Sequence, residues 1–366
     1  MLRRSGRSSL GWQLALGALA AAAVLLGYAP AAGAGICGSR AVKSVLSKSV
    51  GPAERLNYDD YTRYPGTDRA LESLSGAGIL VKSNRATGCA LWEWWWHGVE
   101  FVNDYDYGRQ IQVALYPADG NSALGEAGDA YGLPSIRVDE RHPSPCVTFS
   151  ADRSAASPSE VTAAAPLEWC PEFYGGGVDR PLVYPAVRLG KTLTLNWSGP
   201  DGVDRHWPVA LFRTVINSPA IPRATVEAPT GYLNATLNTY YHYDPATRRL
   251  TVDPLQDIRA RTARGLGYNL KWSAGPMAVI LAAGPGSGAT AMGVYINNPN
   301  SGFVLYDNSL GRDGGQGGSN FVKWEVHYDG AISAGTWTYD TWIITDTVQN
   351  ILDDMNRLYA WKVSSR

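Results

Sequence analysis

Short runs that alternate apolar and polar residues fill most of the chain from Ile79 onward. The run ALWEWWW at 90–96 is followed by VEFVN at 99–103, and only His97-Gly98 separates the two. A two-residue turn that ends in glycine between such runs is typical of a β-hairpin. The run RQIQVALY at 109–116 alternates again. These patterns predict strands that each bury one face.

Further β-rich runs follow between turn-forming Gly, Pro, Asn and Asp residues. They are VRLGKTLTLNWSG, HWPVALFRTVI, ATVEAPTGYLNATLNTYYHYD, RRLTVD, MAVILAAG, TAMGVYIN, FVKWEVHYD and GTWTYDTWIITD. Only TVQNILDDMNRLYAW, which follows a capping Asp346, has helical periodicity. Its apolar stripe consists of Val348, Ile351, Leu352, Met355, Leu358 and Tyr359. Many strands without alternating helices predict an all-β fold, a large antiparallel β-sandwich with a C-terminal helix.

The 366 residues divide into three predicted segments. Residues 1–34 have the form of a signal peptide, with arginines before an apolar run and a cleavage site at Ala32-Gly33-Ala34. An uncleaved anchor is disfavoured because the apolar run is short for a bilayer. Residues 35–75 are a polar lead-in and 76–366 a single β-sandwich domain. Stretches rich in turn-forming residues at 117–135 and 141–182 predict loops. The mature protein is expected to be secreted, extracellular or periplasmic, without a membrane span.

Four cysteines, Cys37, Cys89, Cys146 and Cys170, fit an oxidising compartment and predict two disulfides. Three pairings are possible, and the sequence does not choose between them. No C-x-x-C pair occurs and the five histidines are scattered, which predicts no metal site. The glycine-rich GPGSGAT lacks the Lys-Ser/Thr ending of a phosphate loop, and we expect no cofactor.

Charge and aromatic content narrow the class of partner. The 32 Lys+Arg nearly cancel the 33 Asp+Glu, so no field of one sign is available to attract nucleic acid or an anionic membrane. Tryptophan and tyrosine, at 13 and 20 residues, far outnumber the 6 phenylalanines. Aromatic rings with a polar atom suit surfaces that bind sugars. We therefore expect a polysaccharide or oligosaccharide as the partner.

The stretch 91–132 concentrates the candidate binding residues. Alternation puts Trp92, Trp94 and Trp96 on one face, where Trp94 and Trp96 are predicted to cover the apolar faces of pyranoses. Gln110 and Gln112 share one face of the next strand and suit sugar hydroxyls. Arg109, at the start of that strand, suits a carboxylate of the substrate or an acid of the protein.

The same stretch contains carboxylates that are candidate catalytic groups. Asp106 stands between two runs, and Glu126 and Asp129 lie on a glycine-flanked loop. Glycoside hydrolysis needs one carboxyl group as proton donor and a second as nucleophile or base. Turn formation is the alternative role for Asp106, and a merely mobile loop is the alternative for the other two.

Two histidines lie on predicted strands. His242 alternates with tyrosines, and with Tyr241 or Tyr243 as partner it is a candidate acid or base, also for β-elimination. A half-buried strand histidine without a catalytic role is the alternative. His327 shares a face with Lys323 and Glu325, and for these three the sequence favours a solvated stripe over a site.

Several of these segments resemble a known group of proteins. GVEFVNDYDYGRQIQ with GEAGDAYG, and later TYYHYDPATRRL, AMGVYINN and FVKWEVHY, resemble exported bacterial proteins of largely unassigned role. The resemblance covers about Gly76 to Tyr359. The pattern is similar to the β-supersandwich of galactose-mutarotase-like, carbohydrate-active proteins. It carries over no catalytic set.

The leading interpretation is an exported carbohydrate-active protein that cleaves a polysaccharide in an aromatic-lined cleft, with a glycoside hydrolase favoured over a polysaccharide lyase. The alternatives are a non-catalytic glycan-binding protein and a structural protein whose tryptophans belong to the core. Whether the protein is an enzyme stays open at this point.

Overall fold

The computed structural model describes residues 71–85, 88–102, 110–117, 123–125, 146–165, 167–169, 182–183, 186–199, 208–264, 266–270, 275–298, 300–310 and 320–364. All of these fall within one compact unit, Ala34–Arg366. The predicted signal peptide and the lead-in up to residue 70 lie outside the described residues.

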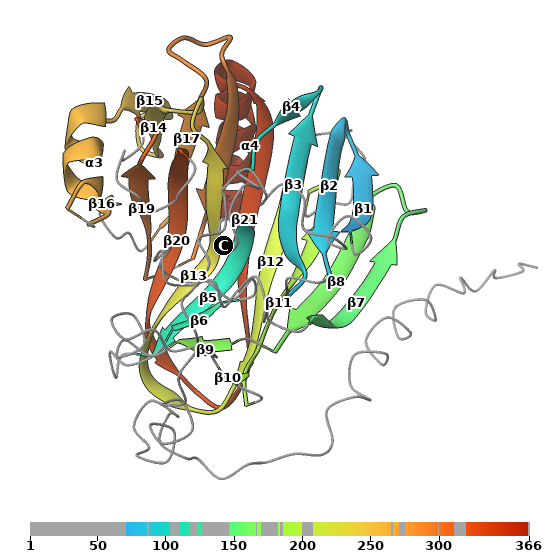
Figure 1. Ribbon diagram of the computed structural model, residues 1–366. Helices are drawn as coiled ribbons and strands as arrows, with labels where there is room; N and C mark the ends of the chain where they lie inside the picture. Colours follow the sequence, from blue (N-terminus) through green and yellow to red (C-terminus); the bar gives the residue numbers. More distant parts are fainter. Residues whose placement is uncertain are drawn as a thin grey trace, which may run out of the picture. The chain divides into compact units, whose positions relative to one another are not determined.

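Two antiparallel sheets form the fold (Figure 1). The first runs in the order β1 (Leu71–Gly76), β2 (Ile79–Asn84), β3 (Ala90–Trp96), β5 (Ile111–Pro117), β13 (Ile221–Asn234), β20 (Phe321–Ile332), β19 (Ser301–Asp307) and β16 (Tyr268–Asn269). Attached to it are β4 (Val99–Glu100), β6 (Ala123–Gly125), β9 (Leu167–Trp169) and β10 (Leu182–Val183). The second runs in the order β15 (Arg249–Val252), β14 (Thr239–Asp244), β17 (Met277–Ala282), β18 (Thr290–Ile296), β21 (Gly335–Thr347), β12 (Val209–Ser218), β11 (Arg188–Thr194), β8 (Ser159–Ala164) and β7 (Cys146–Asp152). The predicted antiparallel β-sandwich is confirmed.

The main core lies between the two sheets. Alternate residues of the first sheet, such as Trp94 and Trp324, meet alternate residues of the second, such as Phe212 and Val294. Gly231 on β13 makes room for the indole of Trp324, because a Cβ at this position would lie 2.5 Å from the ring. The inner face of each strand is therefore fixed by apolar packing, and the opposite face of the first sheet is left for polar groups.

The helix α4 (Val348–Ser364) covers the far face of the second sheet. Four of its predicted apolar residues, Val348, Ile351, Met355 and Leu358, are buried, and Leu352 and Tyr359 pack against them. Its start differs from the prediction: the Thr347 hydroxyl, rather than Asp346, accepts the Asn350 N–H, at 3.4 Å. In the part of the chain that the structure describes, no helix is both long and apolar enough to cross a membrane.

The His97-Gly98 turn is confirmed, with both residues at positive φ between β3 and β4. Three other expectations need correction. The first described strand, β1, starts at Leu71 rather than near Ile79. The predicted loops at 117–135 and 141–182 are not all loop, because the first contains β6 and the second contains β7, β8 and β9. The strand β19 and the helix α3 (Leu255–Thr262) were not predicted, because neither has a clean polar–apolar alternation.

A disulfide between Cys89 and Cys146 joins the start of β3 in the first sheet to β7 in the second. Cys37 and Cys170, the other two cysteines, lie outside the described residues. Beside the disulfide, the buried Lys191 ammonium donates to the Cys89 carbonyl and lies 3.6 Å from Glu160 Oε1. The disulfide and the hydrogen bond from Lys191 to the Cys89 carbonyl together tie the two sheets at this end, because Lys191 and Glu160 both belong to the second sheet.

Candidate functional site

The outer face of the first sheet carries a cluster of buried charges on β20. Lys323, Glu325 and His327 point to this face, because Trp324 and Val326 between them belong to the core. Lys323 and Glu325 are only 6% and 3% exposed. The interpretation of these three residues as a solvated stripe was therefore wrong: alternation gave the shared face, whereas burial comes from the surrounding fold.

A β-bulge in the neighbouring strand β13 brings a fourth charged residue to the cluster. Glu227 pairs with His327, Thr230 pairs with Glu325, and the register shifts between the two pairs. The extra residue lets both Glu227 and Thr230 point to the outer face, which strict alternation would not allow. The inward Ala228 carbonyl accepts a hydrogen bond from Thr341 of the second sheet, at 2.8 Å, which anchors the bulge.

The four charged side chains contact one another closely. Lys323 Nζ donates to Glu325 Oε1 and lies 3.9 Å from Glu227 Oε2. His327 Nε2 lies 2.6 Å from Glu325 Oε2 and 3.8 Å from Glu227 Oε1. No hydrogen bond from a described residue reaches Glu227 Oε2, although the atom is buried. We call Glu227, Lys323, Glu325 and His327 the charge cluster.

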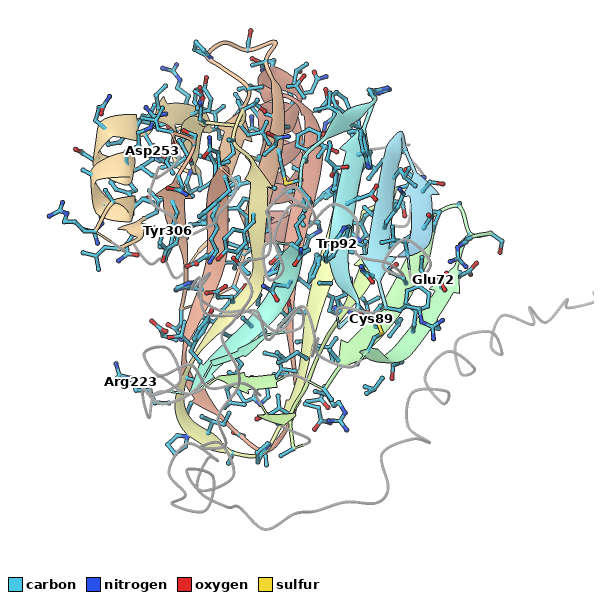
Figure 2. All side chains as sticks on the ribbon, in the orientation of Figure 1. Glu72, Cys89, Trp92, Arg223, Asp253 and Tyr306 are labelled. Atoms are coloured by element: carbon cyan, nitrogen blue, oxygen red, sulfur yellow. A yellow bond between two sulfur atoms is a disulfide. The ribbon has the colours of Figure 1, made fainter. Side chains whose placement is uncertain are left out.

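Two tyrosines flank the lysine of the charge cluster. The ammonium of Lys323 lies 4.5 Å from the ring centre of Tyr232 on β13 and 5.2 Å from that of Tyr306 on β19. Both rings attract the cation through their negative faces. Burial is the main cause that raises the pKa of both phenols, which stay neutral at physiological pH. Tyr306 is labelled in Figure 2.

The pKa values of the two carboxyl groups in the cluster are shifted in opposite directions. Burial, together with the charge of Glu325, raises the pKa of Glu227. Burial also acts to raise the pKa of Glu325, but the Lys323 ammonium and the bond to His327 outweigh it, and the pKa falls to about 2. Glu325 is thus an ionised carboxylate at neutral pH, while Glu227 holds its proton more tightly.

The pKa values of both basic groups of the cluster are raised. Burial acts to lower the pKa of Lys323, but Glu227 and Glu325 outweigh it and raise the pKa well above its usual range. Burial likewise acts to lower the pKa of His327, and the bond to Glu325 reverses the direction. The cluster therefore combines a carboxyl group with a raised pKa, an ionised carboxylate, a buried ammonium and an imidazole with a raised pKa, all in close contact.

The charge cluster is poorly suited to a metal ion, because Lys323 already occupies the carboxylates. Ligand atoms of Glu227, Glu325 and His327 lie within 4.8 Å of one another, which is a geometry that three metal ligands share. The Lys323 ammonium, however, already binds one of these carboxylates and lies close to the other. A divalent ion there would meet a buried positive charge, so we assign no metal to the site.

The amides predicted for sugar binding lie on the same face. The register places Gln112 opposite Thr230, which pairs with Glu325 on its other side, while Ile111 and Val113 point into the core. Gln110 precedes them by alternation on the outer face. Both amides are buried, and the Tyr116 hydroxyl further along β5 hydrogen-bonds the Glu227 carboxylate. Sequence alternation thus placed both amides on the face of the charge cluster, and their predicted role in sugar binding stays a prediction.

The tryptophan prediction needs correction. Trp94 is fully buried and Trp96 packs against the same core, so the predicted stacking of a sugar on Trp94 is wrong. A register shift in the β2–β3 pair breaks the alternation between Leu91 and Glu93, and Trp92 does not pack against the core between the sheets, which places it on the outer face. Trp92 is half-buried there, on the strand next to β5. Among these tryptophans Trp92, not Trp94 or Trp96, shares the face of the charge cluster.

The predicted pair of His242 with Tyr241 or Tyr243 is also wrong. His242 Nδ1 lies 2.8 Å from Asp253 Oδ1, whereas Tyr241 and Tyr243 point to the α4 face of the second sheet. The bond to Asp253 is the main cause that raises the pKa of His242. This histidine belongs to the second sheet, and the charge cluster belongs to the first.

Four predicted site residues cannot be compared with the cluster. Asp106, Arg109, Glu126 and Asp129 lie outside the described residues, and their predicted roles stay predictions. Glu227 was missed because a single glutamate in the run VEAPTGY carries no signal of its own. The Pro229 two residues later was the available hint, since proline inside a strand marks a bulge or an edge.

No protein-family model matches the sequence, and no curated protein matches it. Solved structures with a similar fold include a candidate aldose 1-epimerase from Escherichia coli, at 9% identity and TM-score 0.41, covering 76% of this chain and 99% of that one. A galactose mutarotase-like protein from Clostridium acetobutylicum has 8% identity and TM-score 0.37, covering 75% and 94%. An α-mannosidase from Enterococcus faecalis has 8% identity and TM-score 0.42, covering 79% of this chain but 31% of that one. At these values no activity transfers to this chain.

Proposed function

We propose that the protein is a carbohydrate-active enzyme that cleaves glycosidic bonds at the charge cluster. The observation that carries this proposal is the pair Glu227 and Glu325: two buried carboxyl groups with ligand oxygens within 4.8 Å and pKa values shifted in opposite directions. Glu227 is the proton donor to the leaving oxygen, and the ionised Glu325 is the nucleophile or base. Carboxyl groups about 5–5.5 Å apart are typical of retaining glycosidases, whereas inverting enzymes need a larger gap for a water.

The surroundings of the pair support a sugar as the substrate. Tyr116, Tyr232 and Tyr306 lie on the strands around the cluster, and Trp92 shares the outer face. Gln112 adds an amide on the same face, across Thr230 from Glu325. Flat rings that cover apolar sugar faces, with amides and hydroxyls for the sugar hydroxyls, are the composition that carbohydrate sites use. The chain also has no excess charge that favours nucleic acid.

A polysaccharide lyase is the second candidate, and the two cations favour it. Lys323 and His327 would neutralise the carboxylate of a uronic acid, and Tyr116, bound to Glu227, would serve in proton transfer at the leaving oxygen. A lyase built on His242 with Tyr241 has no such support, because the two side chains lie on opposite faces of β14.

Export through the N-terminal signal peptide is part of the proposal. The Cys89–Cys146 disulfide supports it, because disulfides persist mainly in oxidising compartments. Mass spectrometry of protein collected outside the cytoplasm should give a mature chain that begins near Gly35, after the predicted cleavage site. A chain that keeps its first residues and stays in the cytoplasm would contradict the export.

The test is incubation of the mature protein with a panel of neutral and uronic-acid polysaccharides. New reducing ends without ultraviolet absorbance identify a hydrolase, and absorbance of unsaturated sugars identifies a lyase. Glu227→Gln should reduce kcat by ~10²–10⁴-fold, because it removes the transferable proton while preserving the shape. Glu93→Gln is the matched control, since Glu93 is also paired with a lysine, Lys82, on this sheet.

The outcomes separate the proposals. If Glu227→Gln and Glu93→Gln lower kcat equally, Glu227 has no catalytic role. If every polymer stays intact while some raise the melting temperature, the protein binds glycans without cleaving them. Activity that depends on Glu126 or Asp129 rather than Glu227 would move the site to residues outside the described part of the chain.

A further inference from the structure

Lys323 is the least expected member of the charge cluster. A lysine in the middle of a strand normally extends to solvent, but this side chain is 8% exposed and lies between the rings of Tyr232 and Tyr306. Its ammonium is compact and strongly hydrated in water, so full burial requires partners that replace the lost water. The two rings and the carboxylates of the cluster are these partners.

The groups that face the ammonium come from three strands. Glu227 and Tyr232 face it from β13, Glu325 and His327 from its own strand β20, and Tyr306 from β19. From β5, Tyr116 acts only through its bond to Glu227, and Gln112 contributes a neutral amide. The ammonium and the imidazole of His327 are the only cations that any of the described residues present to the two carboxyl groups.

Both cations lie closer to Glu325 than to Glu227. Lys323 Nζ bonds Glu325 directly but is 3.9 Å from Glu227. His327 Nε2 is 2.6 Å from Glu325 and 3.8 Å from Glu227. The carboxyl groups of Glu227 and Glu325 have oxygens within 4.8 Å of each other, and two carboxyl groups at that separation cannot both ionise without a cost in free energy. The unequal distances decide which of them carries the negative charge.

We propose that Lys323, held between the rings of Tyr232 and Tyr306, is a positioning residue that makes Glu325 the ionised carboxylate and leaves Glu227 as the proton donor. The inference rests on the proposed function for its catalytic meaning. Lys323 itself gives up no proton: Glu227 donates one to the leaving oxygen and regains one from water. The rings fix the ammonium on the Glu325 side, and the assignment of roles follows from that placement.

The first test is the pH profile of kcat/KM for Lys323→Met, which keeps the length of the side chain without its charge. Without the ammonium Glu325 holds its proton more tightly, so the acid limb of the profile should move up by at least one pH unit, with a loss in kcat larger than the change in KM. Lys82→Met removes the other lysine of this sheet that pairs with a glutamate, Glu93, and should leave the profile in place. An unmoved acid limb in Lys323→Met would overturn the inference.

A second pair of variants guards against misfolding. Tyr306→Leu removes one ring from the ammonium and should shift the acid limb in the same direction by less, whereas Tyr306→Phe keeps the ring and should not shift it. Tyr306 is only half-buried, so both variants are expected to fold. Equal profiles for the two would contradict the role of the ring.

The third measurement does not depend on activity. Titration of carboxyl-labelled glutamate by ¹³C NMR should show Glu325 ionised throughout the neutral range in the unmodified protein, and a titration moved to higher pH in Lys323→Met. If the protein cleaves no polymer but the titration moves, the proposed function fails and the role of Lys323 stands. If cleavage is found and the titration does not move, the role of Lys323 fails alone.

Discussion

Burial raises the pKa of the Asp354 carboxyl group on α4. The side chain is almost fully enclosed where α4 meets the second sheet, and burial raises its pKa from 3.8 to about 6, with Arg357 acting in the opposite direction. A folded-state pKa above the unfolded one means that the native protein binds more protons between about pH 4 and pH 6. Stability from this group is therefore complete below about pH 4 and is lost as the pH rises to about 6.

Asp354→Asn should remove this loss. A shift of about two pKa units corresponds to ~3 kcal/mol, so the variant should raise the free energy of unfolding by up to that amount at pH 7 and by almost nothing at pH 4. Urea unfolding at the two pH values measures the difference. Asp353→Asn, at the exposed neighbouring position, is the control. The same gain at both pH values would show that packing, not charge, is responsible.

The site residues differ in how far the sequence could find them. Alternation placed Gln110 and Gln112 on one face, and it put Lys323, Glu325 and His327 together. It could not tell a buried polar face from a solvated one, because burial is decided by segments distant in the sequence. Glu227 reaches the cluster only through the bulge in β13, and Trp92 only through the shift in β3. Both local irregularities reverse the face that strict period-two alternation assigns.

At the scale of elements, the contact between α4 and the second sheet depends on a glycine in β18. Gly293 lies opposite Ile351 and Met355, and a Cβ there would come within 2.8 Å of the Met355 methyl group. Gly293→Val should therefore push α4 off the sheet and lower the free energy of unfolding by ~1–3 kcal/mol. The change is measured by denaturant unfolding.

A matched glycine checks that prediction. A Cβ at Gly288, in the turn before β18, would meet nothing within 4 Å. Gly288→Val should therefore change the free energy of unfolding by far less than Gly293→Val. If both variants lose the same stability, the loss comes from valine itself rather than from the contact with α4.

Elements with strong local patterns were predictable, and elements defined by their neighbours were not. The turn at His97-Gly98 and the apolar stripe of α4 follow from two-residue and 3.6-residue periodicities. The strand β19 reads SGFVLYD and is buried on both faces over most of its length, so it has no alternation to detect. The helix α3 is short and has one fully buried residue, Ile258, which leaves little of an apolar stripe.

At the scale of the whole molecule, the second sheet and α4 support the first sheet from behind, and the outer face of the first sheet is left to polar groups. Buried charges there are costly, and a rigid scaffold is what keeps four of them in fixed contact. The Thr341 bond to the Ala228 carbonyl links the second sheet to the bulge directly beneath Glu227. The second sheet therefore supports the charge cluster through this hydrogen bond as well as through the apolar packing between the sheets.

The disulfide between Cys89 and Cys146 tests how strongly the two sheets depend on each other. It closes a loop with a sequence separation of 57 and joins strands of different sheets. Replacing both cysteines by serine should lower the free energy of unfolding by ~4 kcal/mol, because the unfolded chain regains the entropy of the open loop. Guanidinium unfolding under oxidising conditions measures the loss.

The charge cluster lies on central strands away from the disulfide, so polymer cleavage under native conditions should persist in the double variant. A change below ~1 kcal/mol would mean that the core and the hydrogen bond from Lys191 to the Cys89 carbonyl hold the sheets without the covalent link. A loss of cleavage at full stability would mean that the disulfide positions the site.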